Sequence, residues 1–153
     1  MIAAERLPRE IPPLWLAVAL LVMGALHTQL PVLTLMHWPW SLLGFVVIAA
    51  STLLMLVCLW QFHRAKTGIR PFTPAHQLVV GGAYRFTRNP MYLGLIGVSL
   101  GVAIRLGTVS ALCVPPLFFL VLDRRFVRRE EVFLRERFGA AFEDYCRRVR
   151  RWL

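Results

Sequence analysis

Two long apolar stretches fill the first half of the chain. From Ile11 to His63 there is no Lys, Arg, Asp or Glu. The apolar runs are 14–30 and 41–62, and Pro31 and a tryptophan-rich cluster separate them. One membrane crossing needs about 20 apolar residues, and Trp and Pro are typical of membrane interfaces and helix ends. The pattern predicts two transmembrane helices joined by a short uncharged loop.

A second pair of apolar runs follows, over residues 90–104 and 106–122. Each would be about 24 Å long as a helix, against a hydrocarbon core about 30 Å thick. They therefore span only marginally, or they form a tight hairpin packed against the first pair. Arg105-Leu106-Gly107 is the expected turn, and Pro115-Pro116 should kink the last helix.

Polar sequence lies on either side of this pair. Residues 63–89 form a glycine- and proline-bearing loop that is too long for a simple connector. Residues 123–153 repeat apolar side chains at helical spacing, with Arg on the flanks. This last segment is predicted to be an amphipathic helix, broken or not at Gly139, that lies along the membrane surface.

The elements together predict one fold class. We expect an all-α integral membrane protein with about four transmembrane helices, the last two a short hairpin, plus a C-terminal amphipathic helix. The whole chain, 1–153, is expected to form a single membrane domain.

The charge is confined to one predicted side of the membrane. Of the 18 Lys and Arg residues, only Arg105 lies between apolar runs on the opposite side. The positive-inside rule therefore places both termini and the 63–89 loop in the cytoplasm, and we expect a bacterial inner (plasma) membrane protein. The net charge of +10 suits anionic lipid headgroups, and its distribution argues against nucleic acid.

Composition supports the membrane assignment. The chain is 58% hydrophobic and 17% charged, whereas soluble domains carry about 25% charged residues. The cysteines show no metal-ligand spacing, and no metal is expected.

An acid pair interrupts the apolar stripe of the C-terminal segment. Glu131 lies in the middle of that stripe, one turn from Val127, and Glu130 lies at its edge. An ionised carboxylate among apolar side chains is unfavourable unless it is paired, so Glu131 should meet a cation, a backbone donor or a ligand. A structural ion pair with a nearby Arg is one interpretation of Glu131, and a solvated flank is one of Glu130.

A second candidate cluster joins the polar loop to the third apolar run. Its glycines allow a ligand to approach the backbone closely, while Pro90 suits a first helical turn and Asn89 suits an N-cap. Two arginines beside a helix N-terminus favour an anion; a turn followed by an interfacial anchor remains the alternative. The candidate residues are Gly81, Gly82, Tyr84, Arg85, Arg88, Asn89, Pro90 and Tyr92.

The order of these motifs resembles a known family. The segment GGAYRFTRNPMYLG precedes an apolar hairpin, and REEVFLRERFGAAFEDYCRRV follows it. This is similar to isoprenylcysteine carboxyl methyltransferases, whose signature is Gly-x-Tyr, Arg-His-Pro-x-Tyr-x-Gly, a hairpin, Glu-Glu-x-x-Leu, Phe-Gly and Arg-Val. Membrane phospholipid methyltransferases share a related pattern. The resemblance covers residues 74–152.

The resemblance implies a cytosolic pocket for S-adenosylmethionine, roofed by the C-terminal segment. It places the second cluster on the cofactor motif, Glu130 and Glu131 on the paired acids, and Arg148 on the Arg of Arg-Val. Arg148 would then hold a substrate carboxylate or phosphate, beside Glu130 if Gly139 leaves the helix unbroken. Asn89 stands where the family often has His and cannot titrate, and Arg150 stands where Pro is common.

The implied function is methyl transfer to a lipophilic acceptor, such as an isoprenylcysteine-type carboxylate, with membrane lipids as partners. A phospholipid amine is an alternative acceptor. A non-catalytic membrane interaction subunit with the same fold is a second alternative, and the presence of both acids and Arg148 argues mildly against it.

Overall fold

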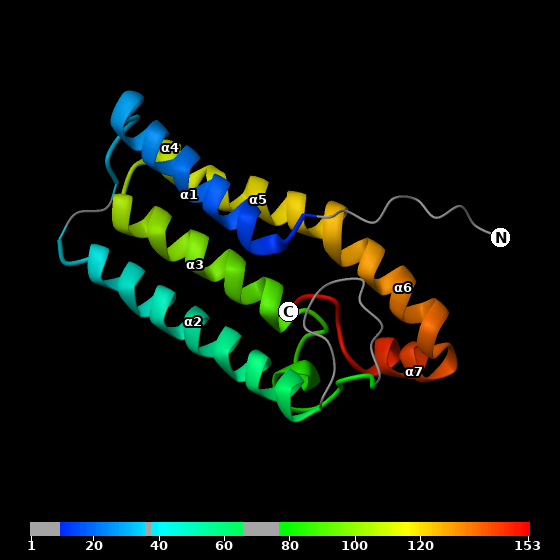
Figure 1. Ribbon diagram of the computed structural model, residues 1–153. Helices are drawn as coiled ribbons and strands as arrows, with labels where there is room; N and C mark the ends of the chain where they lie inside the picture. The colour runs from blue at the N-terminus through cyan, green and yellow to red at the C-terminus, as the bar shows by residue number, and fades with distance from the viewer. Residues whose placement is uncertain (1–9, 36–37, 66–76) are drawn as a thin grey trace.

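The computed structural model describes residues 10–35, 38–65 and 77–153 (Figure 1). In these ranges the chain is helical and has no strand, only an isolated bridge between Thr34 and Thr108. The elements are α1 (Pro12–Gln29), α2 (Ser41–Arg64), the 3₁₀ turn η1 (Gly82–Arg85), α3 (Pro90–Leu106), α4 (Val109–Leu112), α5 (Val114–Leu122), the π-helical turn η2 (Asp123–Val127), α6 (Arg128–Phe138) and α7 (Ala140–Arg148).

The first two helices, α1 and α2, form where the two long apolar runs predicted them. Both α1 and α2 have the length and composition to cross a membrane, and only 17% and 11% of their apolar windows are buried. The core helix of a soluble protein would be mostly buried. Large apolar side chains such as Leu21, Val46 and Leu53 are instead exposed, at 74%, 62% and 62%. These surfaces are suited to lipid.

Helix α3 packs against α2 through glycine. A Cβ atom on Gly101 would lie 2.8 Å from the carbonyl oxygen of Gly44, and one on Gly44 would lie 2.5 Å from that of Gly101. Real Cβ atoms do not approach an oxygen so closely, so the two backbones are in direct contact. Small residues at the interface are how helices associate closely without a hydrophobic driving force.

The turn after α3 lies later than the sequence predicted. The helix continues through Arg105 and Leu106, and Gly107 ends it with a left-handed φ of 72°. The Arg105 guanidinium lies 3.9 Å from the centre of the Phe45 ring. The fourth run divides at Cys113 into α4 and α5, and the two prolines occupy the first turn of α5.

The C-terminal segment is two helices rather than one. Helix α5 runs through η2 into α6 without a gap, and α6 extends beyond the bundle (Figure 1). Gly139, with φ 50° and ψ −123°, then breaks the chain before α7. Helix α7 thus lies beside η1 and the end of α2, and it closes a small core of Cys58, Tyr84, Phe142 and Tyr145. Part of the 63–89 loop, residues 66–76, lies outside the described residues.

Candidate functional site

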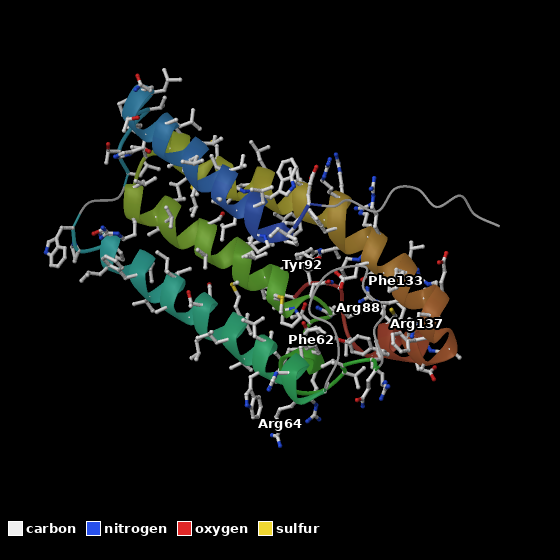
Figure 2. The ribbon with its side chains drawn as sticks, in the orientation of Figure 1. Phe62, Arg64, Arg88, Tyr92, Phe133 and Arg137 are labelled. Carbon is white, nitrogen blue, oxygen red and sulfur yellow. The ribbon has the colours of Figure 1, made fainter. Side chains whose placement is uncertain are left out.

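Three segments that are distant in sequence meet at one end of the bundle. They are η1 with the first turn of α3, the start of α6, and the residues after α7. Figure 2 shows Arg88 and Tyr92 at this end, from which α6 and α7 extend. The Tyr145 hydroxyl donates a 2.7 Å hydrogen bond to the Tyr84 backbone oxygen and so ties α7 to η1.

Glu131 is buried, and two arginines surround it. Glu131 is only 5% exposed. The Oε2 atom accepts hydrogen bonds from Arg151 Nε at 3.1 Å and from Arg151 Nη2 at 2.6 Å. The Oε1 atom lies 3.1 Å from Arg88 Nη2 as an ion pair without hydrogen-bond geometry. The expectation that this carboxylate finds a cation is confirmed, and it finds two.

Glu130 has a different environment from its neighbour. Its Oε2 accepts a 2.8 Å hydrogen bond from the Tyr92 hydroxyl on α3. Burial raises the pKa of the Glu130 carboxyl, the hydrogen bond from Tyr92 opposes that shift, and the charge of Glu131 adds to it. No arginine pairs with Glu130 among the described ion pairs. Glu130 is therefore the acid of this pair whose negative charge is least compensated.

Asn89 holds the N-cap position of α3, but its side chain does not cap the helix. Its Nδ2 donates instead to the backbone oxygen of Arg151 at 3.0 Å. The Thr87 hydroxyl donates to the same oxygen at 3.0 Å, and the Arg88 backbone N–H donates to the oxygen of Arg150 at 2.9 Å. Pro90 occupies the first turn of α3, as predicted.

Gly82 has a left-handed backbone conformation that favours glycine. Its φ is 57°, and the end of the Gln61 side chain on α2 fills the space beside it, with Nε2 1.6 Å from where a Cβ atom would lie. Tyr84 is buried against Phe62, with ring centres 5.6 Å apart, and burial raises the pKa of its hydroxyl. Gly81 and Arg85 are exposed at the two ends of this turn. Of the predicted cofactor residues, Tyr84, Arg88, Asn89, Pro90 and Tyr92 therefore point inward, and Arg85 does not.

Arg148 makes no ion pair with Glu130 or Glu131 among the described residues. It is exposed, and its Nε donates to the backbone oxygen of Asp144 at 3.2 Å on its own helix. Its expected position beside Glu130 required an unbroken helix, and Gly139 breaks that helix. Arg151 reaches the acid pair instead.

Sequence reasoning missed four residues of this region: Thr87, Asp123, Arg151 and Trp152. The signal for Arg151 was the buried Glu131, which demanded a cation. The C-terminal segment has many arginines, and the sequence did not indicate which of them Glu131 would meet.

The chain matches the family described as phospholipid methyltransferase over residues 39–141. It belongs to this family. The match includes α2, the Gly82–Tyr92 cluster, the apolar hairpin and both acids, but it ends before Arg148 and Arg151. The resemblance of the motifs to membrane methyltransferases is thus confirmed.

Two of the curated relatives are named as methyltransferases, and a third is uncharacterized. A probable protein-S-isoprenylcysteine O-methyltransferase of Oryza sativa subsp. japonica is 31% identical over 121 residues, which are 74% of this chain and 60% of the relative. The protein-S-isoprenylcysteine O-methyltransferase of Schizosaccharomyces pombe is 30% identical over 134 residues, 77% of this chain and 55% of the relative. An uncharacterized protein of Haemophilus influenzae is 36% identical over 63 residues, 41% of this chain and all of the relative.

The chain thus spans little more than half the length of the two isoprenylcysteine methyltransferases that it resembles. No solved structure matches it.

Proposed function

We propose that this protein is an S-adenosylmethionine-dependent methyltransferase that acts on a lipophilic acceptor at the cytoplasmic face of the membrane. One observation carries the proposal. The cofactor-motif segment and the paired acids are distant in sequence, yet they are in direct contact through Tyr92–Glu130 and Arg88–Glu131. Membership of the phospholipid methyltransferase family gives that contact its chemical meaning.

The charges of the site suit the proposed cofactor. S-adenosylmethionine carries a sulfonium, an ammonium and a carboxylate. The Glu130 carboxylate is available for one of the cations. Arg88 is suited to the carboxylate, because its buried Nε has no hydrogen-bond partner among the described residues. The exposed Gly81, whose Cβ position has no other atom within 4 Å, leaves room for close approach.

The bound cofactor would supply an activated methyl group for an in-line displacement. Such a reaction depends mainly on holding the two reactants in line, which can contribute several kcal/mol. In this chain the positioning falls to two groups of residues. Glu130 would hold one cation of the cofactor, and the hydrogen bond from Tyr92 fixes its carboxyl group. Glu131 fixes Arg88 in place and is a positioning residue.

The acceptor is proposed from the relatives and the surroundings of the site. The site lies at the end of an apolar bundle, which suits an acceptor that arrives from the lipid. The named function of the Oryza and Schizosaccharomyces relatives favours an isoprenylcysteine-type carboxylate. The family description favours a phospholipid amine as the second candidate. Transfer of labelled methyl to N-acetyl-S-farnesylcysteine and to phosphatidylethanolamine vesicles, side by side, decides between them.

The topology is also a proposal. We propose four crossings formed by α1, α2, α3 and the α4–α5 unit, with the whole chain as one membrane domain and both termini cytoplasmic. Single cysteines at Thr34 and Arg129, in a variant without the native cysteines, test it with a membrane-impermeant maleimide. Arg129→Cys should react only from the cytoplasm and Thr34→Cys only from the other side. The reverse pattern, or reaction of both from one side, would refute this topology.

The decisive experiment for the function is titration of S-adenosylhomocysteine into the protein in lipid nanodiscs. We expect a Kd in the micromolar range, or about −8 kcal/mol at 1 μM. Glu130→Gln should weaken binding or slow methyl transfer by about 100-fold, as loss of a charge-stabilising group commonly does. Arg129→Gln, one residue away on the exposed face, is the matched control. No binding at millimolar ligand would favour the non-catalytic subunit.

A further inference from the structure

The five residues after α7 cross the site instead of leaving the protein. Backbone oxygens of Arg150 and Arg151 accept hydrogen bonds from the 87–89 segment at 2.9–3.0 Å. The Arg151 side chain turns the other way, onto Glu131 of α6. This short stretch therefore bridges the two walls of the proposed cofactor site. We call residues 150–152 the bridge.

The far end of the bridge is anchored where the fourth apolar run ends. Trp152 Nε1 donates a 3.1 Å hydrogen bond to Oδ1 of Asp123, and Arg128 Nε donates to Oδ2 at 2.7 Å. The Trp152 ring also lies 4.9 Å from that of Phe119. Asp123 is 5% exposed, so its carboxylate depends on these donors. It lies in the π-helical turn η2, and such turns are frequent at functional sites.

The two arginines on Glu131 differ in accessibility. The Arg88 side chain is 13% exposed, whereas the Arg151 side chain is 37% exposed. Arg88 lies in the buried wall of the proposed cofactor site, and the Arg151 side chain reaches Glu131 from the solvent side. Of these two arginines, Arg151 makes the hydrogen bonds to Glu131, whereas Arg88 forms an ion pair without hydrogen-bond geometry, so Arg151 has the stronger control over where that carboxylate points.

We propose that Arg151 is a positioning residue for the cofactor site. Arg151 acts through its hydrogen bonds to Glu131, and the contact of Trp152 with Asp123 holds the bridge in place. Arg151 thus fixes the separation between the 87–89 segment and α6. This separation in turn fixes the position of the Arg88 guanidinium. The proposal rests on the proposed function, since the walls that it positions are those of the S-adenosylmethionine site. The family match ends at residue 141, so it does not include the bridge.

The bridge makes a specific prediction about local motion. The Arg88 amide hydrogen is bonded to the bridge, so we expect it to exchange slowly while the bridge is in place. Release of Arg151 should therefore raise exchange in the 86–89 peptide and leave α2 unchanged. A general loss of stability would raise exchange in both, which distinguishes positioning from a merely structural role.

The experiment compares Arg151→Gln and Arg151→Lys with the controls Arg150→Gln and Arg148→Gln in nanodiscs. Arg150 and Arg148 are exposed and lie in the same stretch, and neither side chain contacts an acid among the described ion pairs. Hydrogen exchange and the Kd of S-adenosylhomocysteine are measured on each. Arg151→Gln should raise exchange in the 86–89 peptide and weaken binding, each about tenfold, because it removes a charged hydrogen bond. Arg151→Lys keeps the charge but lacks the planar guanidinium with its several N–H donors. Its exchange rate and Kd should therefore lie between those of Arg151→Gln and the wild type.

Each outcome of these measurements supports or overturns one part of the proposal. Exchange in Arg151→Gln equal to that in the two controls overturns the bridge, whatever the Kd does. Raised exchange with an unchanged Kd overturns its role in cofactor binding. A wild-type protein that binds no S-adenosylhomocysteine refutes the proposed function, while the exchange comparison still tests the bridge.

Discussion

Replacing Glu131 by its amide should destabilise the protein, whereas the same replacement of Glu130 should not. Glu131→Gln keeps the shape of the side chain but puts a neutral amide between Arg88 and Arg151. The amide oxygen can accept from one guanidinium, and the amide N–H₂ then faces the donors of the other. Glu130→Gln keeps an oxygen for the Tyr92 hydroxyl, which is the donor in that bond, and it removes a charge that burial disfavours.

The magnitudes follow from burial. Removing one partner of a buried ion pair costs about 3–5 kcal/mol. Arg88 is 13% exposed and incurs most of that cost. Arg151 is 37% exposed and can be solvated by water, so its share is discounted. We expect Glu131→Gln to lose about 3 kcal/mol, which for a chain of this size lowers the Tm by about 6–12 °C. Glu130→Gln should match the wild type or exceed it.

The assay is thermal unfolding of both variants in one detergent at several pH values. Because the pKa of Glu130 is raised above its ordinary value of 4.5, its stabilising contribution is present below that value and is lost as the pH rises through the raised pKa. Glu130→Gln should therefore match the wild type near pH 4 and become relatively more stable toward pH 8. Equal losses in the two variants at pH 7, or an unchanged Tm for Glu131→Gln, would refute the assigned roles.

Two further substitutions test the packing and the site boundary. Gly101→Ala should destabilise the protein by about 1–3 kcal/mol, because its Cβ would lie 2.8 Å from the Gly44 oxygen and 2.6 Å from Ile48 Cγ1; Gly24→Ala, with nothing within 4 Å, is the control in the same unfolding assay. Arg148→Lys should keep methyl transfer within about twofold of the wild type, since exposed substitutions usually change free energies by less than about 0.5 kcal/mol. A 100-fold loss of rate in an initial-rate assay would show that Arg148 takes part in methyl transfer.

The local pattern of the sequence was enough for the helices. An uncharged apolar run such as 41–62 has few alternatives to a membrane helix, because every backbone polar group must be satisfied inside it. Pro90 marks a helix start for steric reasons that do not depend on the rest of the fold. Glu131 was identified as a paired acid on the same local grounds, since a carboxylate in an apolar stripe needs a partner.

The tertiary structure alone decided which partner it has. A helical wheel extrapolates one phase along the chain, and a single residue at φ 50°, Gly139, cancels that phase for everything after it. The direction of the chain beyond the break is then fixed by contacts with distant segments, such as Trp152 on Asp123 and the Arg151 oxygen on Asn89. Those contacts carry no periodic signal. The sequence therefore predicted only that Glu131 meets a cation, a backbone donor or a ligand, and the fold determined that it meets Arg151 together with Arg88.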